Sequence, residues 1–168
     1  MRVSALSAKK KKRSNFFYII AIVSIIVFGL ILDQFSKFLI LKKLILNESV
    51  PIIKNIFHLT LIFNRGAAFG IFKNYTNFFI FTSILTIFFI IFHLRRNKVI
   101  DRLTFSMILI LTGALGNLID RLRFGFVIDF LDFRIWPVFN LADTMITIGA
   151  LLLAFSILRS SGDASCNF

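Results

Sequence analysis

Long apolar runs alternate with short polar segments along the chain, and they predict four membrane-spanning helices. The runs cover residues 16–32, 75–94, 103–119 and 138–158. A helix of this length rises by about 25–32 Å, which is close to the thickness of the hydrocarbon core of a bilayer. Four spans would place both ends of the chain on the same side of the membrane.

The segment between the first two runs has a different period. From Phe57 to Phe63 apolar and polar residues alternate, interrupted only by Ile62, and FNRGAAFG (63–70) follows. A period of two predicts a strand, and the glycines predict a turn. Because an unpaired strand cannot lie in lipid, we expect a small sheet at the membrane surface. The predicted fold class is a membrane all-α bundle of four transmembrane helices with a small extracytoplasmic β-sheet.

The composition agrees with a membrane protein. Of the 168 residues 58% are hydrophobic, whereas a water-soluble domain averages about 45–50% apolar residues. The net charge of +12 could indicate nucleic-acid binding, but six of the 20 Lys and Arg residues lie within the first 13 positions. Next to an apolar run such a cluster is a topology signal, with contact to anionic lipids as a second use. We therefore expect membrane lipids, and no nucleic acid, as partners.

The positions of Lys and Arg also predict an orientation. The basic N-terminus and the segment RRNK (95–98) both flank apolar spans, which favours the cytoplasmic side for them. We expect residues 1–14 to be a basic cytoplasmic tail, residues 15–159 a single membrane-embedded domain, and residues 160–168 a C-terminal cytoplasmic tail. The predicted strand and a loop at residues 125–136 would then share the outer face.

Metal-binding residues are few. The single cysteine, Cys166, excludes an intrachain disulfide and a Cys-rich metal site. His58 and His93 are separated by a predicted span and would lie on opposite sides of the membrane. We therefore expect neither a metal nor an organic cofactor.

Acidic residues gather near the predicted spans. Four of the eight lie in the stretch from Gly113 to Asp143: Asp120, Asp129, Asp132 and Asp143. A carboxylate at the centre of a membrane helix costs about 2.5–3.5 kcal/mol, and Asp143 is expected about five residues inside the fourth span. If the loop brings the carboxylates of Asp129 and Asp143 together, the two would share one proton, because ionisation of both is costly at low dielectric. Such a pair can activate water to hydrolyse a peptide bond.

Several polar residues also have a plain structural explanation. Asp33 and Lys37 could be only an i, i+4 helix pair. Asn117 and Asn140 could be hydrogen-bonding groups between helices, worth about 0.6 kcal/mol each on average. Arg121 could be an interfacial anchor.

The acids have alternative explanations as well. Asp120 and Asp132 are interpreted as a salt-bridged or solvated pair of surface acids, and Asp129 alone would be a loop acid. Asp143 could also be the proton carrier of a small transporter. A transporter predicts an internal repeat and polar residues at several levels of the spans, and the sequence shows neither. A non-catalytic scaffold would leave Asp143 unexplained.

Five motifs resemble those of lipoprotein signal peptidase, also called signal peptidase II. They are DQFSK (33–37), FNRGAAFG (63–70), GALGNLIDR (113–121), GFVIDF (125–130) and FNLAD (139–143). They follow the family's order and are close to its spacing over most of residues 16–158. The resemblance implies an aspartic endopeptidase of the bacterial cytoplasmic (inner) membrane. Its substrate would be a diacylglyceryl-modified prolipoprotein, cleaved just before the lipid-modified cysteine at a site near the outer face.

The resemblance also implies roles for individual residues. The catalytic pair would be Asp129 and Asp143, with water as the nucleophile and no cofactor. Other motif residues would bind substrate or support the site: Asp33, Lys37, Asn64, Gly66, Ala68, Gly113, Asn117, Arg121, Val127, Phe139, Asn140 and Ala142. We expect the enzyme to work as a monomer.

Overall fold

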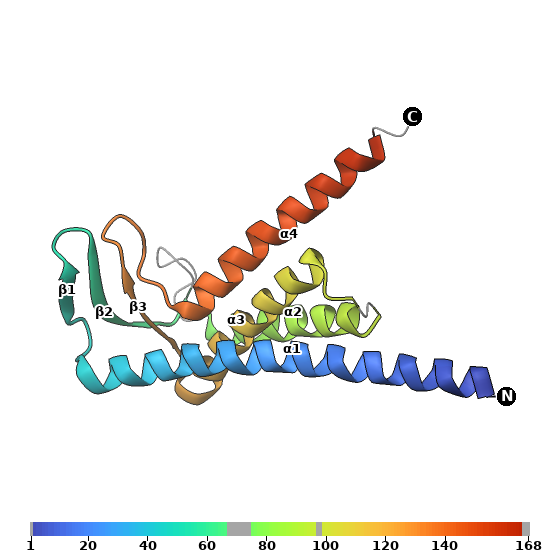
Figure 1. Ribbon diagram of the computed structural model, residues 1–168. Coiled ribbons are helices and arrows are strands. Elements are labelled where there is room, and N and C mark those ends of the chain that lie inside the picture. The colour runs from blue at the N-terminus through green and yellow to red at the C-terminus, as the bar shows by residue number, and fades with distance from the viewer. Residues whose placement is uncertain (1, 67–74, 97–98, 166–168) are drawn as a thin grey trace.

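The computed structural model describes residues 2–66, 75–96 and 99–165 of the chain, and side chains between residues 16 and 159 within those ranges. This part holds four helices and three strands. In chain order they are α1 (Arg2–Lys43), β1 (Ser49–Ile53), β2 (Phe57–Asn64), α2 (Thr76–Arg96), α3 (Arg102–Phe124), β3 (Val127–Asp132) and α4 (Leu141–Ser165). The sheet lies at one end of the helices, and the start of α1 and the end of α4 lie at the other (Figure 1).

All four helices are long and apolar enough to cross a membrane, as the sequence predicted. Helix α3 is the most enclosed, and the other three pack around it. Large side chains on those three helices project outward: Phe28 of α1, Phe88 of α2 and Phe155 of α4 are each more than half exposed. Apolar side chains exposed over whole helices are expected where lipid is the solvent. The predicted fold class, four apolar helices with a small sheet, is confirmed.

Helices α3 and α4 approach each other closely at two glycines. A Cβ atom at Gly113 would overlap the backbone oxygen of Ala142, and one at Gly149 would lie 2.7 Å from the backbone oxygen of Ser106. Small residues let membrane helices pack backbone to backbone. Gly113 therefore permits a close approach of α3 to the first turn of α4.

The sheet is antiparallel, with the strand order β1-β2-β3. Strand β2 is the predicted one, and its pairing with β3 shifts register between Leu59 and Ile62, where the alternation of the sequence is interrupted. Below the sheet, Ile40 near the end of α1 packs with Leu61, Ile128 and Phe130 in one apolar cluster. This cluster attaches the sheet to the C-terminal end of α1.

The loop prediction for residues 125–136 was wrong for its first half. Gly125 does make a turn, with a φ of 77° and its N–H bonded to the oxygen of Arg121. The next residues form strand β3, in which only Leu131 is not buried. Because β3 is covered on both faces, it lacks the alternation by which a half-exposed strand is identified.

Two helix ends also differ from the prediction. Helix α3 continues beyond Ile119 to Phe124. Helix α4 begins at Leu141 instead of Val138, which leaves Pro137 outside the helix. Asp143 consequently lies in the first turn of α4, and not five residues deep in the span.

Candidate active site

Asp129 and Asp143 line one cavity of about 630 Å³ between the sheet and the sheet-facing ends of α3 and α4. They come from different elements, β3 and α4. Other residues from the predicted set also line this cavity: Asn64, Gly66, Asn117, Arg121, Val127 and Phe139. Residues of four of the five sequence motifs therefore line a single site.

Asp129 is held by two amide side chains. The residue is 1% exposed. Asn64 at the end of β2 donates to one of its oxygens at 2.8 Å, and Asn140 donates to the other at 2.7 Å. These bonds fix the orientation of the carboxylate from the sheet side and from the α4 side.

Asp143 is fixed by the local structure of the helix start. Its backbone N–H donates to Oδ1 of Asn140 at 2.9 Å, and its carboxylate accepts the backbone N–H of Asn140 at 3.3 Å. This reciprocal pattern is a capping box, which satisfies free N–H groups at the start of a helix. Asn117 of α3 donates to the other carboxylate oxygen at 2.7 Å. Asn140 therefore bonds to both acids and links them.

Burial and charge make Asp129 a weak acid. Its burial, together with the nearby charge of Asp143, raises its pKa to about 7, although hydrogen bonds from Asn64 and Asn140 act to lower it. A carboxyl group with a pKa near 7 can hold a proton under neutral conditions. A raised pKa at one of two neighbouring carboxyl groups is the pattern expected of a pair that shares one proton.

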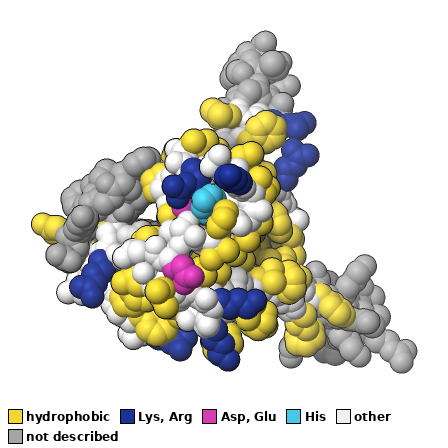
Figure 2. Space-filling model, turned by 90° about the vertical axis from the view of Figure 1, so that its left-hand side faces the viewer, with side chains coloured by type: hydrophobic (Ala, Val, Ile, Leu, Met, Phe, Trp, Pro, Cys, Tyr) yellow, Lys and Arg dark blue, Asp and Glu magenta, His cyan; other side chains and the backbone are white. Residues whose placement is uncertain are grey.

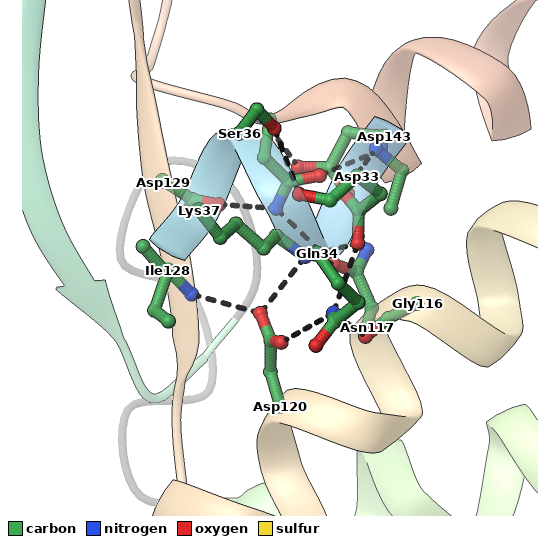
Figure 3. A network of polar contacts seen from close by, with 12 residues as sticks. Asp33, Gln34, Ser36, Lys37, Gly116, Asn117, Asp120, Ile128, Asp129 and Asp143 are labelled. Carbon is green, nitrogen blue, oxygen red and sulfur yellow. Dashed lines mark hydrogen bonds and ion pairs between the residues drawn. The ribbon is translucent and has the colours of Figure 1, made fainter. Parts of the chain in front are cut away.

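Behind this pair lies a buried network centred on Lys37 of α1 (Figure 3). The Lys37 ammonium is 2.9 Å from the carboxylate of Asp33 and 2.8 Å from that of Asp120. It also donates to Oδ1 of Asn117 at 3.3 Å. Gln34 donates to both carboxylates, at 3.1 Å to Asp33 and 2.9 Å to Asp120. Removing one partner of a buried ion pair leaves an uncompensated charge, so this network depends on all its members.

Comparison with known proteins agrees with this arrangement. A family model described as Signal peptidase (SPase) II matches residues 25–159. The chain belongs to the signal peptidase II family. The lipoprotein signal peptidase of Halothermothrix orenii is 50% identical over 129 residues, covering 77% of this chain and 89% of that protein. That of Moorella thermoacetica is 49% identical over 136 residues, covering 80% and 90%.

Solved structures support the same assignment. A structure described as a bacterial membrane enzyme, 30% identical in sequence, superposes with a TM-score of 0.80 over 85% of this chain and 90% of the other. A second, described in the same way, is 31% identical with a TM-score of 0.72. As a signal peptidase II the chain is a protease and a multi-pass membrane protein. This assignment replaces the transporter and scaffold alternatives.

The structure corrects the interpretation of Asp120 and Asp132 as surface acids. Both are buried in this signal peptidase II, at 0% and 5% exposure. They are ion-paired, but not with each other: Asp120 pairs with Lys37, and Asp132 with Arg134 at 3.0 Å. Burial alone would raise the pKa of Asp132, but hydrogen bonds from Thr60 and Arg134 hold it below its usual value.

The remaining predicted residues lie behind the cavity-lining set. Asp33, Lys37 and Asn140 are buried in the network, and Ala142 is buried where Gly113 meets α4. The Asp33–Lys37 ion pair is present, as the structural alternative predicted, but it lies in the interior. Ala68 lies outside the described residues.

Sequence reasoning missed several residues of this site. Gln34 and Asp120 belong to the buried network, although both lie within the motifs quoted above. Phe79 of α2 and Trp136 line the cavity, and the guanidinium of Arg121 lies 5.0 Å from the centre of the Phe79 ring. An aromatic residue within an apolar span gives no local signal that it faces a cavity, whereas the N-x-x-D spacing of Asn140 and Asp143 could have revealed the cap.

Proposed function

We propose that this signal peptidase II is an aspartic endopeptidase that removes signal peptides from diacylglyceryl-modified prolipoproteins. It cleaves before the lipidated cysteine, and Asp129 and Asp143 activate the attacking water. The proposal rests on one observation: two carboxylates from separate elements line one cavity and are linked by Asn140.

The mechanism follows from a shared proton. Asp143 takes a proton from water, and the water oxygen attacks the scissile carbonyl carbon while protonated Asp129 donates its proton to the carbonyl oxygen. The tetrahedral diol then collapses. Asp143 passes its proton to the departing amine nitrogen, and a diol hydroxyl returns a proton to Asp129. The pair ends in its starting state, and the products are a carboxyl terminus and a new amino terminus on the lipidated cysteine.

The raised pKa of Asp129 supports its role as the member of the pair that carries the proton. A group that stays protonated near neutral pH can polarise a carbonyl, as a fully ionised pair cannot. Asn64, Asn117 and Asn140 hold the two carboxylates without adding a positive charge.

The shape of the molecule supports a site near the outer face of the bacterial inner membrane. The sheet lies far from the start of α1 and the end of α4 (Figure 1), so termini in the cytoplasm, which the basic N-terminus favours, would put the sheet on the outer side. Seen from the sheet end, basic, acidic and histidine side chains lie among hydrophobic ones (Figure 2), a mixture suited to a membrane surface. Two acyl chains would keep the substrate cysteine at this level. A single domain at residues 15–159, working as a monomer, is sufficient for this chemistry.

Cleavage of a lipidated precursor tests the proposal. Asp129→Asn and Asp143→Asn each remove a carboxylate while keeping the side-chain volume, and each should abolish the gel shift that marks signal-peptide removal. Asp132→Asn is the matched control, because Asp132 is also a buried acid of β3 but lies outside the cavity-lining set. Thermal unfolding must show that the variants are folded. Activity retained by either folded variant of the pair would overturn the proposal.

A further inference from the structure

Two carboxylates outside the proposed catalytic pair hold the backbone beside it. Asp33 of α1 accepts the backbone N–H of Ala142 at 3.0 Å. Asp120 of α3 accepts the backbone N–H of Ile128 at 3.2 Å. Ala142 directly precedes Asp143, and Ile128 directly precedes Asp129. Each member of the proposed pair therefore follows a residue whose N–H is fixed by a buried carboxylate.

Both of these carboxylates are held by the same two residues of α1. The Lys37 ammonium contacts Asp33 and Asp120, and the Gln34 amide donates to both (Figure 3). The side chain of Lys37 is 2% exposed, and those of Asp33 and Asp120 are fully buried. The start of α4 and the middle of β3 are thus tied to one point on α1. The separation of these two elements therefore depends on the side chains of Asp33, Lys37 and Asp120 and on the partly buried Gln34.

We propose that Asp33, Lys37 and Asp120 form a positioning clamp that sets the distance between Asp129 and Asp143. The proposal rests on the function proposed above for that pair, and it concerns residues that act through the pair without touching substrate. Stability alone gives little reason for such a clamp, because a buried ion cluster is often replaced by apolar residues without loss. Positioning does give a reason, because a proton-sharing pair works only over a narrow range of separations.

The clamp also affects the charge around the site. Asp129 is faced by Asp143 from α4 and by Lys37 from α1, and Arg121 of α3 lines the same cavity. Asp120→Asn removes one negative charge from beside Lys37, so the uncompensated positive charge near Asp129 increases. This change lowers the pKa of Asp129, and the alkaline limb of the rate profile should move to lower pH.

The test compares three variants with the wild type in cleavage of a lipidated precursor. Asp120→Asn breaks the clamp at β3, and Gln34→Met removes the amide link while leaving all charges in place. Asp132→Asn is the control on the same strand. The misplaced pair should lower kcat about tenfold to a hundredfold in Asp120→Asn, and less in Gln34→Met. Binding should change little, because none of these residues lines the cavity.

Binding has an internal probe, because the single tryptophan of the chain, Trp136, lines the cavity. Its fluorescence, titrated with a tryptophan-free lipopeptide substrate, gives the affinity for each variant. If Asp120→Asn does not fold, Gln34→Met still decides the question. The expected result is a lower kcat with unchanged affinity in the clamp variants, a shifted alkaline limb in Asp120→Asn, and near wild-type behaviour in Asp132→Asn.

Two results would overturn the clamp. One is a folded Asp120→Asn or Gln34→Met enzyme with the wild-type kcat. The other is an equal loss of kcat in Asp132→Asn. Either result, with Asp129→Asn and Asp143→Asn inactive, leaves the proposed function standing. Activity in the Asp129 or Asp143 variants would instead remove the function on which the clamp depends.

Discussion

Gly113, where α3 meets the first turn of α4, offers a sharp test of how closely the active site depends on helix packing. Gly113→Ala would place a Cβ 2.7 Å from Cγ1 of Ile146 and closer still to the backbone oxygen of Ala142. Ordinary van der Waals contact begins near 3.4 Å. The start of α4 therefore has to move outward by roughly 1 Å, since packed interiors transmit such strain. Asp143 follows Ala142 directly and moves with it.

The size of the effect follows from this displacement. A misplacement of about 1 Å near reacting groups costs about a hundredfold in rate, or about 2.7 kcal/mol of transition-state stabilisation. Overpacking the helix interface also lowers the free energy of unfolding by about 1–3 kcal/mol. For Gly113→Ala we therefore expect kcat to fall about a hundredfold, together with a lower melting temperature.

Gly149→Ala separates the two effects. Its Cβ would lie 2.7 Å from the backbone oxygen of Ser106 and 3.0 Å from the backbone nitrogen of Ile110. The backbone overlap is smaller than at Gly113 and involves the same two helices, but it occurs farther along α4, away from Asp143. We expect a lower melting temperature here as well, with kcat within about threefold of the wild type. Precursor cleavage at saturating substrate and thermal unfolding in the same detergent measure both quantities. Equal losses of kcat in the two variants would refute the reasoning.

Two further predictions concern the acid pair and its cap. Burial raises the pKa of Asp129 to about 7, so the singly protonated pair persists below that pH and is lost as pH rises through it. On the alkaline side kcat should therefore fall about tenfold per pH unit. A rate profile that stays flat to pH 9 would contradict this. Asn140→Ser keeps a side-chain oxygen that caps α4 but removes the amide group that donates a hydrogen bond to Asp129. Asn140→Ala removes both interactions. Both variants should lose cleavage, but only the Ala variant should unfold more easily, by about 0.5–2 kcal/mol; a Ser variant with the wild-type kcat would show that the amide bond to Asp129 is dispensable.

The four spans could be predicted because apolar length is a local property. Their ends could not, because they depend on partners elsewhere in the chain. Val138 and Phe139 extend the apolar run toward Trp136, yet α4 begins only after Asn140, where the cap satisfies its first N–H groups. At α3, Asp120 looks like the polar end of a span but is a buried part of the helix.

The strands show the same division between local and distant information. Strand β2 alternates and was found. Strand β1 is short, exposed at every residue and contains Pro51, so it carries no pattern. Nearly every side chain of strand β3 is buried, so its sequence VIDFLD has neither the alternation of a half-exposed strand nor the polar composition of a loop. Its position was therefore set by its partners, with Asn64 opposite Val127 and Ile62 opposite Asp129.

The proposed catalytic pair was chosen through the motif resemblance, while the partners of the buried acids became visible only in the structure. Lys37 lies 83 positions before Asp120 in the sequence, and nothing local links them. Pattern reasoning assigned Asp120 to the surface because a lone acid at the end of a span is normally solvated. The buried ammonium that reverses this conclusion belongs to another helix.

The distribution of partners among the four acids explains how one site can hold so much charge and still react. In the described part of the chain, Lys37 pairs with Asp33 and Asp120, whereas the hydrogen bonds to Asp129 and Asp143 come from asparagine side chains and a backbone amide. An ammonium in direct contact would favour full ionisation of the acid pair and remove the proton that hydrolysis needs. Amides orient a carboxylate without fixing its charge. In the proposed mechanism the lysine stabilises the two acids that accept backbone N–H groups, and the asparagines leave the other two free to exchange a proton.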